Sequence, residues 1–178
     1  QEIGLVYWDY YHDDENFYKS YLRMHRQLSE KTVFAGGGWV WNGVAPNFRV
    51  AFATTEAAMR ACKAEGVREA VCTMWQDDGA ETPMAAGLPS IVLFAEHGFA
   101  KEPDRECLKE QFEFLTGSSF DAYLALGEFD AAPGSETFDN PSKYLLYQDV
   151  MMGLFDGQVK EADLSLIHIS EPTRPEPI

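Results

Sequence analysis

The chain has 178 residues, of which 46% are hydrophobic and 13% aromatic, and its formal net charge at pH 7 is −15. This composition is typical of a globular chain that buries a core, and it excludes disorder as the main state. The acidic balance disfavours nucleic acid and anionic membrane surfaces as partners, because both need clustered Lys and Arg, and no apolar stretch approaches the roughly 20 residues that cross a bilayer.

The first predicted unit is a strand followed by a helix. Residues 3–8 are short, apolar and rich in β-forming side chains, so we expect a strand that is buried on both faces. Asp13 or Asp14 can cap the helix that follows, which presents one apolar face as far as Leu28.

Two more units repeat this order of strand, loop and helix. Their strands are expected at residues 32–35 and 69–75. The helix of the second unit is expected to begin at a cap formed by Thr54 or Thr55 and to stop at Gly66, and that of the third follows Pro89 and Ser90 and runs through Phe94. The strands are separated by helical crossovers, which predicts a parallel sheet.

Beyond residue 103 the pattern predicts helices only. Leu108, Phe112 and Leu115 line a helix that ends at Gly117. Ser118 or Ser119 starts a second helix, and a third is expected over residues 142–154.

Polar and aromatic side chains gather where each predicted strand ends. Carboxyl ends of parallel strands meet at one edge of a sheet, so these residues should converge there. Aromatic faces stack on the C–H face of a sugar and carboxylates accept hydrogen bonds from its hydroxyls, which favours a carbohydrate site over a phosphate site. A structural role in sealing the rim of the sheet is the alternative. The candidate substrate-binding residues are Trp8, Asp9, Tyr10, Trp39, Trp41, Trp75, Asp77 and Glu81.

Four segments resemble the β-N-acetylhexosaminidases of glycoside hydrolase family 20, in particular the bacterial branch with a helical C-terminal domain. They are residues 5–11 (LVYWDYY), 34–43 (FAGGGWVWNG), 73–81 (TMWQDDGAE) and 140–149 (NPSKYLLYQD). Gln76 departs from the family pattern, which usually has Gly between the Trp and the Asp of the third segment.

The resemblance implies an α/β fold in which residues 1–102 form the closing sector, strands 6–8, of a (β/α)8 TIM barrel. Residues 103–163 would then begin an α-helical C-terminal domain. It also implies a retaining, substrate-assisted hydrolysis of terminal β-linked GlcNAc or GalNAc. The alternative is a non-catalytic carbohydrate-binding or scaffold module derived from a barrel.

The resemblance places the catalytic Asp–Glu pair on the fourth barrel strand, upstream of Gln1, so no catalytic residue is expected in this chain. Asp14-Glu15 is the only adjacent Asp–Glu in the chain, and we interpret it as a helix start. Trp75 would pack against the acetamido pocket, Asp77 and Glu81 would bind ring hydroxyls, and Tyr10, with Tyr7 and Tyr11 as alternatives, would donate to the acetamido oxygen.

No cofactor or metal is expected. Cys62, Cys72 and Cys107 are widely spaced, which predicts reduced, buried thiols, and the histidines lack the spacing of metal ligands. Gly36 to Gly38 precede a tryptophan instead of a helix start, so we interpret them as a sharp turn or a close approach to ligand. The oligomeric state stays open, with a homodimer as one expectation.

The two ends of the chain are unusual for native termini. Gln1 follows no methionine, basic leader or cleavage site, which is typical of a cut within a reading frame, and we expect a cytoplasmic rather than a secreted protein. Residues 164–174 are identical to one translation of a transposase-type sequencing adapter, so we interpret 164–178 as non-native, with a genuine Pro-rich tail as the alternative. Without one Arg and two Glu in that segment the charge is −14. Three isolated units would expose sheet edges, which predicts an aggregation-prone fragment.

Overall fold

The computed structural model describes residues 3–76, 79–130, 144, 147, 151 and 152. Its strands are β1 (Leu5–Trp8), β2 (Thr32–Gly37) and β3 (Glu69–Thr73). Its α-helices are α1 (Glu15–Leu28), α2 (Phe48–Glu65), α3 (Leu88–Phe99), α4 (Arg105–Thr116) and α5 (Phe120–Ala125). Two short 3-10 helices, η1 (Met84–Gly87) and η2 (Leu126–Asp130), precede α3 and follow α5.

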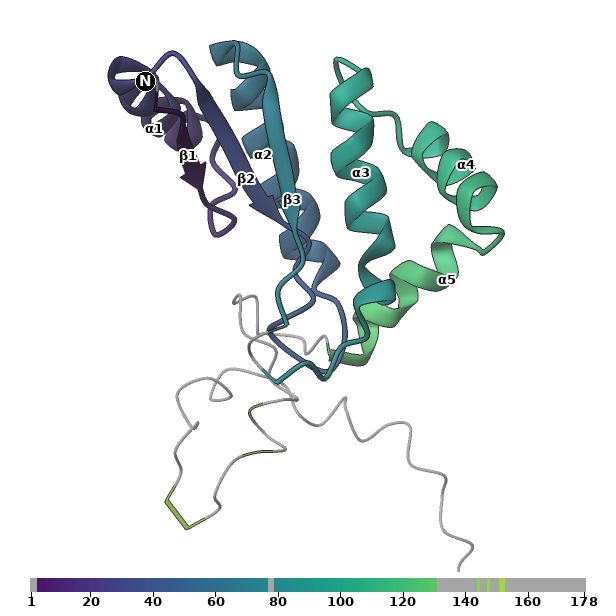
Figure 1. The fold of residues 1–178 in the computed structure, drawn as a ribbon. Coiled ribbons are helices and arrows are strands. Elements are labelled where there is room, and N and C mark those ends of the chain that lie inside the picture. The colour runs from purple at the N-terminus through teal and green to yellow at the C-terminus, as the bar shows by residue number, and fades with distance from the viewer. Residues whose placement is uncertain (1–2, 77–78, 131–143, 145–146, 148–150, 153–178) are drawn as a thin grey trace, which may run out of the picture.

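The three strands form one parallel sheet in the order β1-β2-β3, which confirms the predicted sheet (Figure 1). Tyr7 of β1 lies beside Phe34 of β2, which lies beside Ala70 of β3. The chain therefore has a mixed α/β fold, and the described strands do not close into a barrel.

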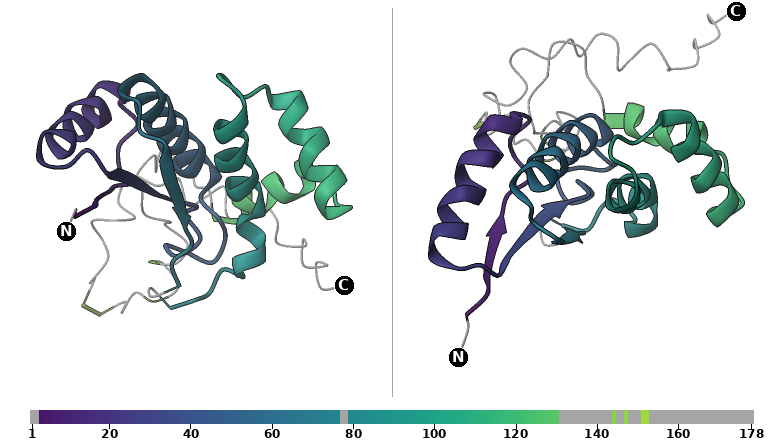
Figure 2. Two further views of the ribbon diagram at one scale, coloured as in Figure 1. Left: turned by 45° about the horizontal axis from the view of Figure 1, so that its top comes forward. Right: turned by 90° about the horizontal axis from the view of Figure 1, so that it is seen from above.

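Only one face of this sheet carries helices (Figure 2). Tyr7 and Phe34 point to that face and are buried in a core with Tyr18, Leu22 and the alanine-rich side of α2. The expectation that β1 is buried on both faces is wrong, because Val6 and Trp8 alternate to the other face and are 52% and 50% exposed. No helix among the described residues covers that second face.

Local capping explains where α1 and α2 begin and end. The Asp14 carboxylate accepts a hydrogen bond from Asn16 N at 2.8 Å, which confirms the predicted cap of α1. The predicted start of α2 at Thr54 or Thr55 is wrong, because the helix begins after Asn47, whose side chain accepts from Val50 N at 3.1 Å. The predicted end of α2 is confirmed, since Gly66 adopts the left-handed conformation with φ 70°.

The helices after residue 103 pack against α3. Leu93 of α3, Leu108 and Phe112 of α4 and Phe120 of α5 form one buried apolar cluster. Leu115 is exposed, so the prediction that it lines this face is wrong. The predicted end of α4 at Gly117 and the start of α5 at Ser119 are confirmed. Most of the helix predicted over 142–154 lies outside the described residues.

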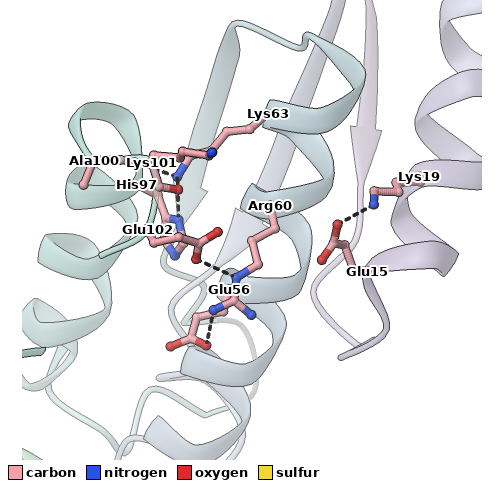
Figure 3. A network of polar contacts seen from close by, with 9 residues as sticks. All are labelled: Glu15, Lys19, Glu56, Arg60, Lys63, His97, Ala100, Lys101 and Glu102. Atoms are coloured by element: carbon pink, nitrogen blue, oxygen red, sulfur yellow. Dashed lines mark hydrogen bonds and ion pairs between the residues drawn. The ribbon is translucent and has the colours of Figure 1, made fainter. Parts of the chain in front are cut away.

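Lys63, which is partly buried, and His97, which is buried, join the C-terminal ends of α2 and α3 (Figure 3). Lys63 Nζ donates to the carbonyl oxygens of Ala100 and Lys101, each at 2.7 Å, and lies 3.1 Å from Nδ1 of His97. Beside it, Arg60 Nε donates to Glu102 at 3.0 Å. Burial, together with the charge of Lys63, lowers the pKa of His97 to about 4.

The three thiols differ in environment. Cys62 is buried, Cys72 is partly buried and Cys107 is exposed, so the expectation of three buried thiols is wrong for Cys107. Burial raises the pKa of Cys62 to about 12 and that of Cys72 to about 11. In the described part of the chain, no helix has both the length and the apolar character needed to cross a membrane.

Candidate functional site

The carboxyl ends of the three strands lie at one edge of the sheet, and the loops that follow them lie together there (Figure 1). Asp9 N donates to Ala35 O at 3.1 Å and Gly38 N donates to Thr73 O at 2.9 Å, so the hydrogen bonds between neighbouring strands continue into the loops. The chain's four tryptophans all follow or end these strands. The structure thus brings together the three segments that the sequence placed at one edge.

Trp8 and Trp75 form the accessible part of this edge. Their rings stack with centroids 5.3 Å apart and an interplanar angle of 29°. Trp8 stands on the sheet face without helices, and Trp75 Nε1 is buried with no hydrogen-bond partner among the described residues. The pair offers a broad aromatic surface at the edge of the sheet.

Trp39 and Trp41 stack on each other with centroids 4.8 Å apart, but they lie inside the fold, 1% and 6% exposed. Trp39 Nε1 donates to the carbonyl of Tyr10 at 2.9 Å, and the Tyr10 ring lies 4.9 Å from that of Trp41. These contacts join the loop after β2 to the loop after β1. Tyr10, Trp39 and Trp41 therefore form an inner aromatic layer that supports the edge.

The glycine run before Trp39 makes room for side chains of this chain. A Cβ on Gly37 would lie 2.6 Å from Cη2 of Trp41, and a Cβ on Gly38 would overlap Sδ of Met74. Trp39 itself has φ 51°, in the left-handed region that residues other than glycine rarely adopt. The run thus makes room for the ring of Trp41 and the thioether of Met74. The sequence analysis, which offered a sharp turn or a close approach to ligand, did not foresee this packing.

Hydrogen bonds within the loop over residues 38–47, and from the loop after β3, fix its position. Asn47 N donates to Trp39 O at 2.9 Å and so closes the loop on itself. Thr82 Oγ1, fully buried, donates to Gly43 O at 2.7 Å, and Gln76 Nε2 donates to Val40 O at 3.4 Å. Gln76, which departs from the family pattern, therefore links the loops after β2 and β3. Sequence reasoning missed Thr82 because a single Thr in a loop carries no periodic or motif signal.

Asp9 is surrounded by donors from its own segment. Its carboxylate accepts from the hydroxyl of Tyr7 and from Tyr11 N, each at 2.9 Å, and lies 2.9 Å from Nδ1 of His12. Burial and the bond to Asp9 raise the pKa of Tyr7 well above its ordinary value. Asp9 and Tyr7 thus shape the turn after β1, and direct contact of Asp9 with a sugar stays a prediction.

Glu81 is partly buried and follows a tight backbone turn, with φ 111° at Gly79 and 56° at Ala80. Its carboxylate folds back over Gly79, where a Cβ would overlap both carboxylate oxygens. Asp77, the other acid predicted to bind ring hydroxyls, lies outside the described residues. The carboxylate position therefore depends on glycine at residue 79.

The described residues hold no cluster of three or more His, Cys, Asp or Glu side chains suited to a metal ion. Asp14 caps α1 and Glu15 pairs with Lys19 at 2.5 Å within the first turns of that helix. This agrees with the interpretation of Asp14-Glu15 as a helix start.

Comparison with protein families links the end of the chain to carbohydrate enzymes. Residues 121–170 match the family model of the glycoside hydrolase 20C C-terminal domain. This segment begins in α5 and includes η2. The match supports the family 20 resemblance seen in the strand-end motifs and implies a glycoside hydrolase family context for the full-length protein. A comparison with curated proteins gives no match.

Proposed function

We propose that the full-length protein is a retaining exo-β-N-acetylhexosaminidase that removes terminal β-linked GlcNAc or GalNAc. The observation that carries this proposal is the match of residues 121–170 to the C-terminal domain of glycoside hydrolase 20C. That segment follows three parallel strand–helix units whose carboxyl ends hold four tryptophans and Glu81. A terminal N-acetylhexosamine on a carbohydrate is the substrate that this combination favours.

In this proposal β1, β2 and β3 are the sixth, seventh and eighth strands of a (β/α)8 barrel. All three strands are parallel, and their helices cover one face only. The exposed side chains of Val6 and Val71 on the second face would point into the barrel interior. About 250 residues form a complete barrel, so the described units supply a sector of one.

The reaction would use the acetamido group of the substrate as the nucleophile. Its carbonyl oxygen attacks the anomeric carbon while an acid donates a proton to the leaving oxygen, and water then opens the cyclic intermediate with retention. The Asp–Glu pair that orients the amide and supplies the proton is proposed to lie upstream of Gln1.

This chain would supply the wall that holds the sugar. Trp8 and Trp75 would present an aromatic surface to the C–H face of the ring. Glu81, with Asp77, would accept hydrogen bonds from ring hydroxyls. Trp39 and Trp41 would act from the layer beneath, by holding the loops in place.

The proposal is tested with the full-length protein and an aryl N-acetyl-β-glucosaminide. We expect hydrolysis with a β-anomer as the first product in the proton NMR spectrum, and no hydrolysis of the matching aryl β-glucoside, which lacks the acetamido nucleophile. Hydrolysis of both substrates, or inversion at the anomeric carbon, would contradict the mechanism. Sugar binding without hydrolysis would instead favour the non-catalytic carbohydrate-binding module.

Glu81 provides the residue-level test. The Glu81→Ala variant should lower kcat/KM by about 100-fold, since charge-assisted hydrogen bonds to two hydroxyls would be lost. Glu110→Ala, at an exposed acid on α4, is the matched control and should stay within twofold of the wild type. Near-normal activity of Glu81→Ala would remove Glu81 from the site.

A further inference from the structure

The backbone of η2 lies directly against the segment that begins α2. A Cβ built on Gly127 would lie 3.2 Å from Cδ2 of Phe48 and 3.2 Å from the carbonyl oxygen of Pro46. Both distances are shorter than ordinary van der Waals contact with a methyl carbon, and one of the two neighbours is backbone. Only glycine allows the two segments to come this close without a shift.

The segment that Gly127 touches is continuous with the loop that carries Trp39 and Trp41. Pro46 precedes Asn47, whose N–H bonds to Trp39 O at 2.9 Å. The side chain of Asn47 also caps α2. A displacement at Pro46 would therefore pass through Asn47 to the backbone of Trp39.

The helical region has little freedom to yield at this contact. α5 is held against α3 and α4 by the buried side chains of Leu93, Leu108, Phe112 and Phe120. η2 continues from α5 without a break, and this end of α5 reaches the same side of the molecule as the loops after β2 and β3 (Figure 1). A side chain at residue 127 would thus press on the loop more than on the helices.

We propose that Gly127 is a positioning residue: through its close approach to Pro46 and Phe48, the helical C-terminal region sets the position of the loop after β2 at the sugar-binding edge. The expected effect on substrate binding rests on the proposed function. The expected effect on the position of the loop rests only on the contacts of Gly127. The helical region then determines substrate affinity although none of its described residues belongs to the predicted site.

The test compares Gly127→Ala and Gly127→Val with the same changes at Gly98 in the full-length protein. Gly98 lies in α3, is exposed, and has no atom within 4 Å of an added Cβ. With the aryl N-acetyl-β-glucosaminide, Gly127→Val should raise KM about tenfold and Gly127→Ala about threefold, with kcat changed by less than threefold. The Gly98 variants should leave KM within 1.5-fold of the wild type.

This pattern separates positioning from a merely structural role. Loss of stability alone would lower the melting temperature and the amount of active enzyme, and so the apparent kcat, while KM stayed constant. A KM for folded Gly127→Val within twofold of that for Gly98→Val would overturn the proposal. If Gly127→Val does not fold, the same criterion is applied to Gly127→Ala.

Acrylamide quenching of tryptophan fluorescence provides a readout that needs no activity. A side chain at residue 127 should increase the accessible fraction of indole emission, because Trp39 and Trp41 are buried in the native loop. If the wild type does not hydrolyse the glycoside, the proposed function fails and quenching alone decides this inference. Unchanged quenching in Gly127→Val would then refute it, and increased quenching would support it.

Discussion

The hydroxyl of Thr82 forms a hydrogen bond between two loops of the candidate site, the loop after β3 and the loop after β2. Thr82 is fully buried, and its Oγ1 donates to the carbonyl of Gly43 at 2.7 Å. The Thr82→Val variant keeps the shape of the side chain but removes the donor, so the buried carbonyl of Gly43 loses this partner. We expect a clear loss of stability from this one atom.

The size of the effect follows from the burial of both groups. An unsatisfied buried carbonyl costs about 1 to 3 kcal/mol, and a change of 1 kcal/mol shifts the melting temperature by about 2 to 4 °C for a domain of this size. Thr82→Val should therefore melt about 2 to 12 °C below the wild type. This decrease in melting temperature should be larger than the decrease caused by a Thr→Val substitution at a site where the carbonyl partner keeps another hydrogen-bond donor.

Thr54 supplies that matched control. It is also buried, and its Oγ1 donates to Ala51 O at 3.3 Å, but this carbonyl lies inside α2 and keeps the backbone N–H four residues on. Differential scanning fluorimetry at pH 7 should place Thr54→Val within about 1 °C of the wild type. Equal melting temperatures for Thr82→Val and Thr54→Val would refute the reasoning.

Two further predictions use titration and thiol chemistry. Burial and Lys63 lower the pKa of His97 to about 4 in the folded protein, against about 6.5 in an unfolded chain. Between these pH values the unfolded state binds more protons than the folded state. The free energy of unfolding therefore falls as the pH drops below about 6.5. At pH 4.5 the acid-induced drop in the free energy of unfolding should be about 2 to 3 kcal/mol smaller for His97→Gln than for the wild type. Profiles of stability against pH that run parallel for the variant and the wild type would contradict this account. In the native protein an aromatic disulfide reagent should modify Cys107 quickly, and Cys62 and Cys72 only after denaturation, because burial keeps those two thiols protonated. Rapid reaction of two or more of these thiols in the native state would show that the core around Cys62 or Cys72 opens readily.

Much of the fold could be predicted because its signals are local. Asp14, Ser119, Gly66 and Gly117 end or begin helices through hydrogen bonds and backbone conformations that involve only their own neighbours. The start of α2 could not be predicted in this way. Thr54 and Thr55 look like caps locally, but burial of the residues that follow Asn47 extends the helix two turns further.

The sequence predicted where the candidate site lies better than it predicted the role of each residue in it. The order of strands and helices placed the tryptophans at one edge of a parallel sheet. Sequence alone did not distinguish Trp8, which is half exposed, from Trp39, which is buried, because the difference depends on which distant side chains pack over each ring. The sequence likewise left Gly36 to Gly38 open to two interpretations, a sharp turn or a close approach to ligand, because the side chains that pack beside them come from other segments.

The amino-acid sequence by itself determined the acidic character, the alternation of three strands with helices, the parallel sheet and the helical region that follows. Only the tertiary structure decided that one face of the sheet carries the helices, that Gln76 and Thr82 tie two loops together, and that Gly127 meets Pro46. Periodicity and capping act over a few residues and are visible in the chain, whereas these contacts join segments 36 to 81 residues apart and exist only after the chain has packed.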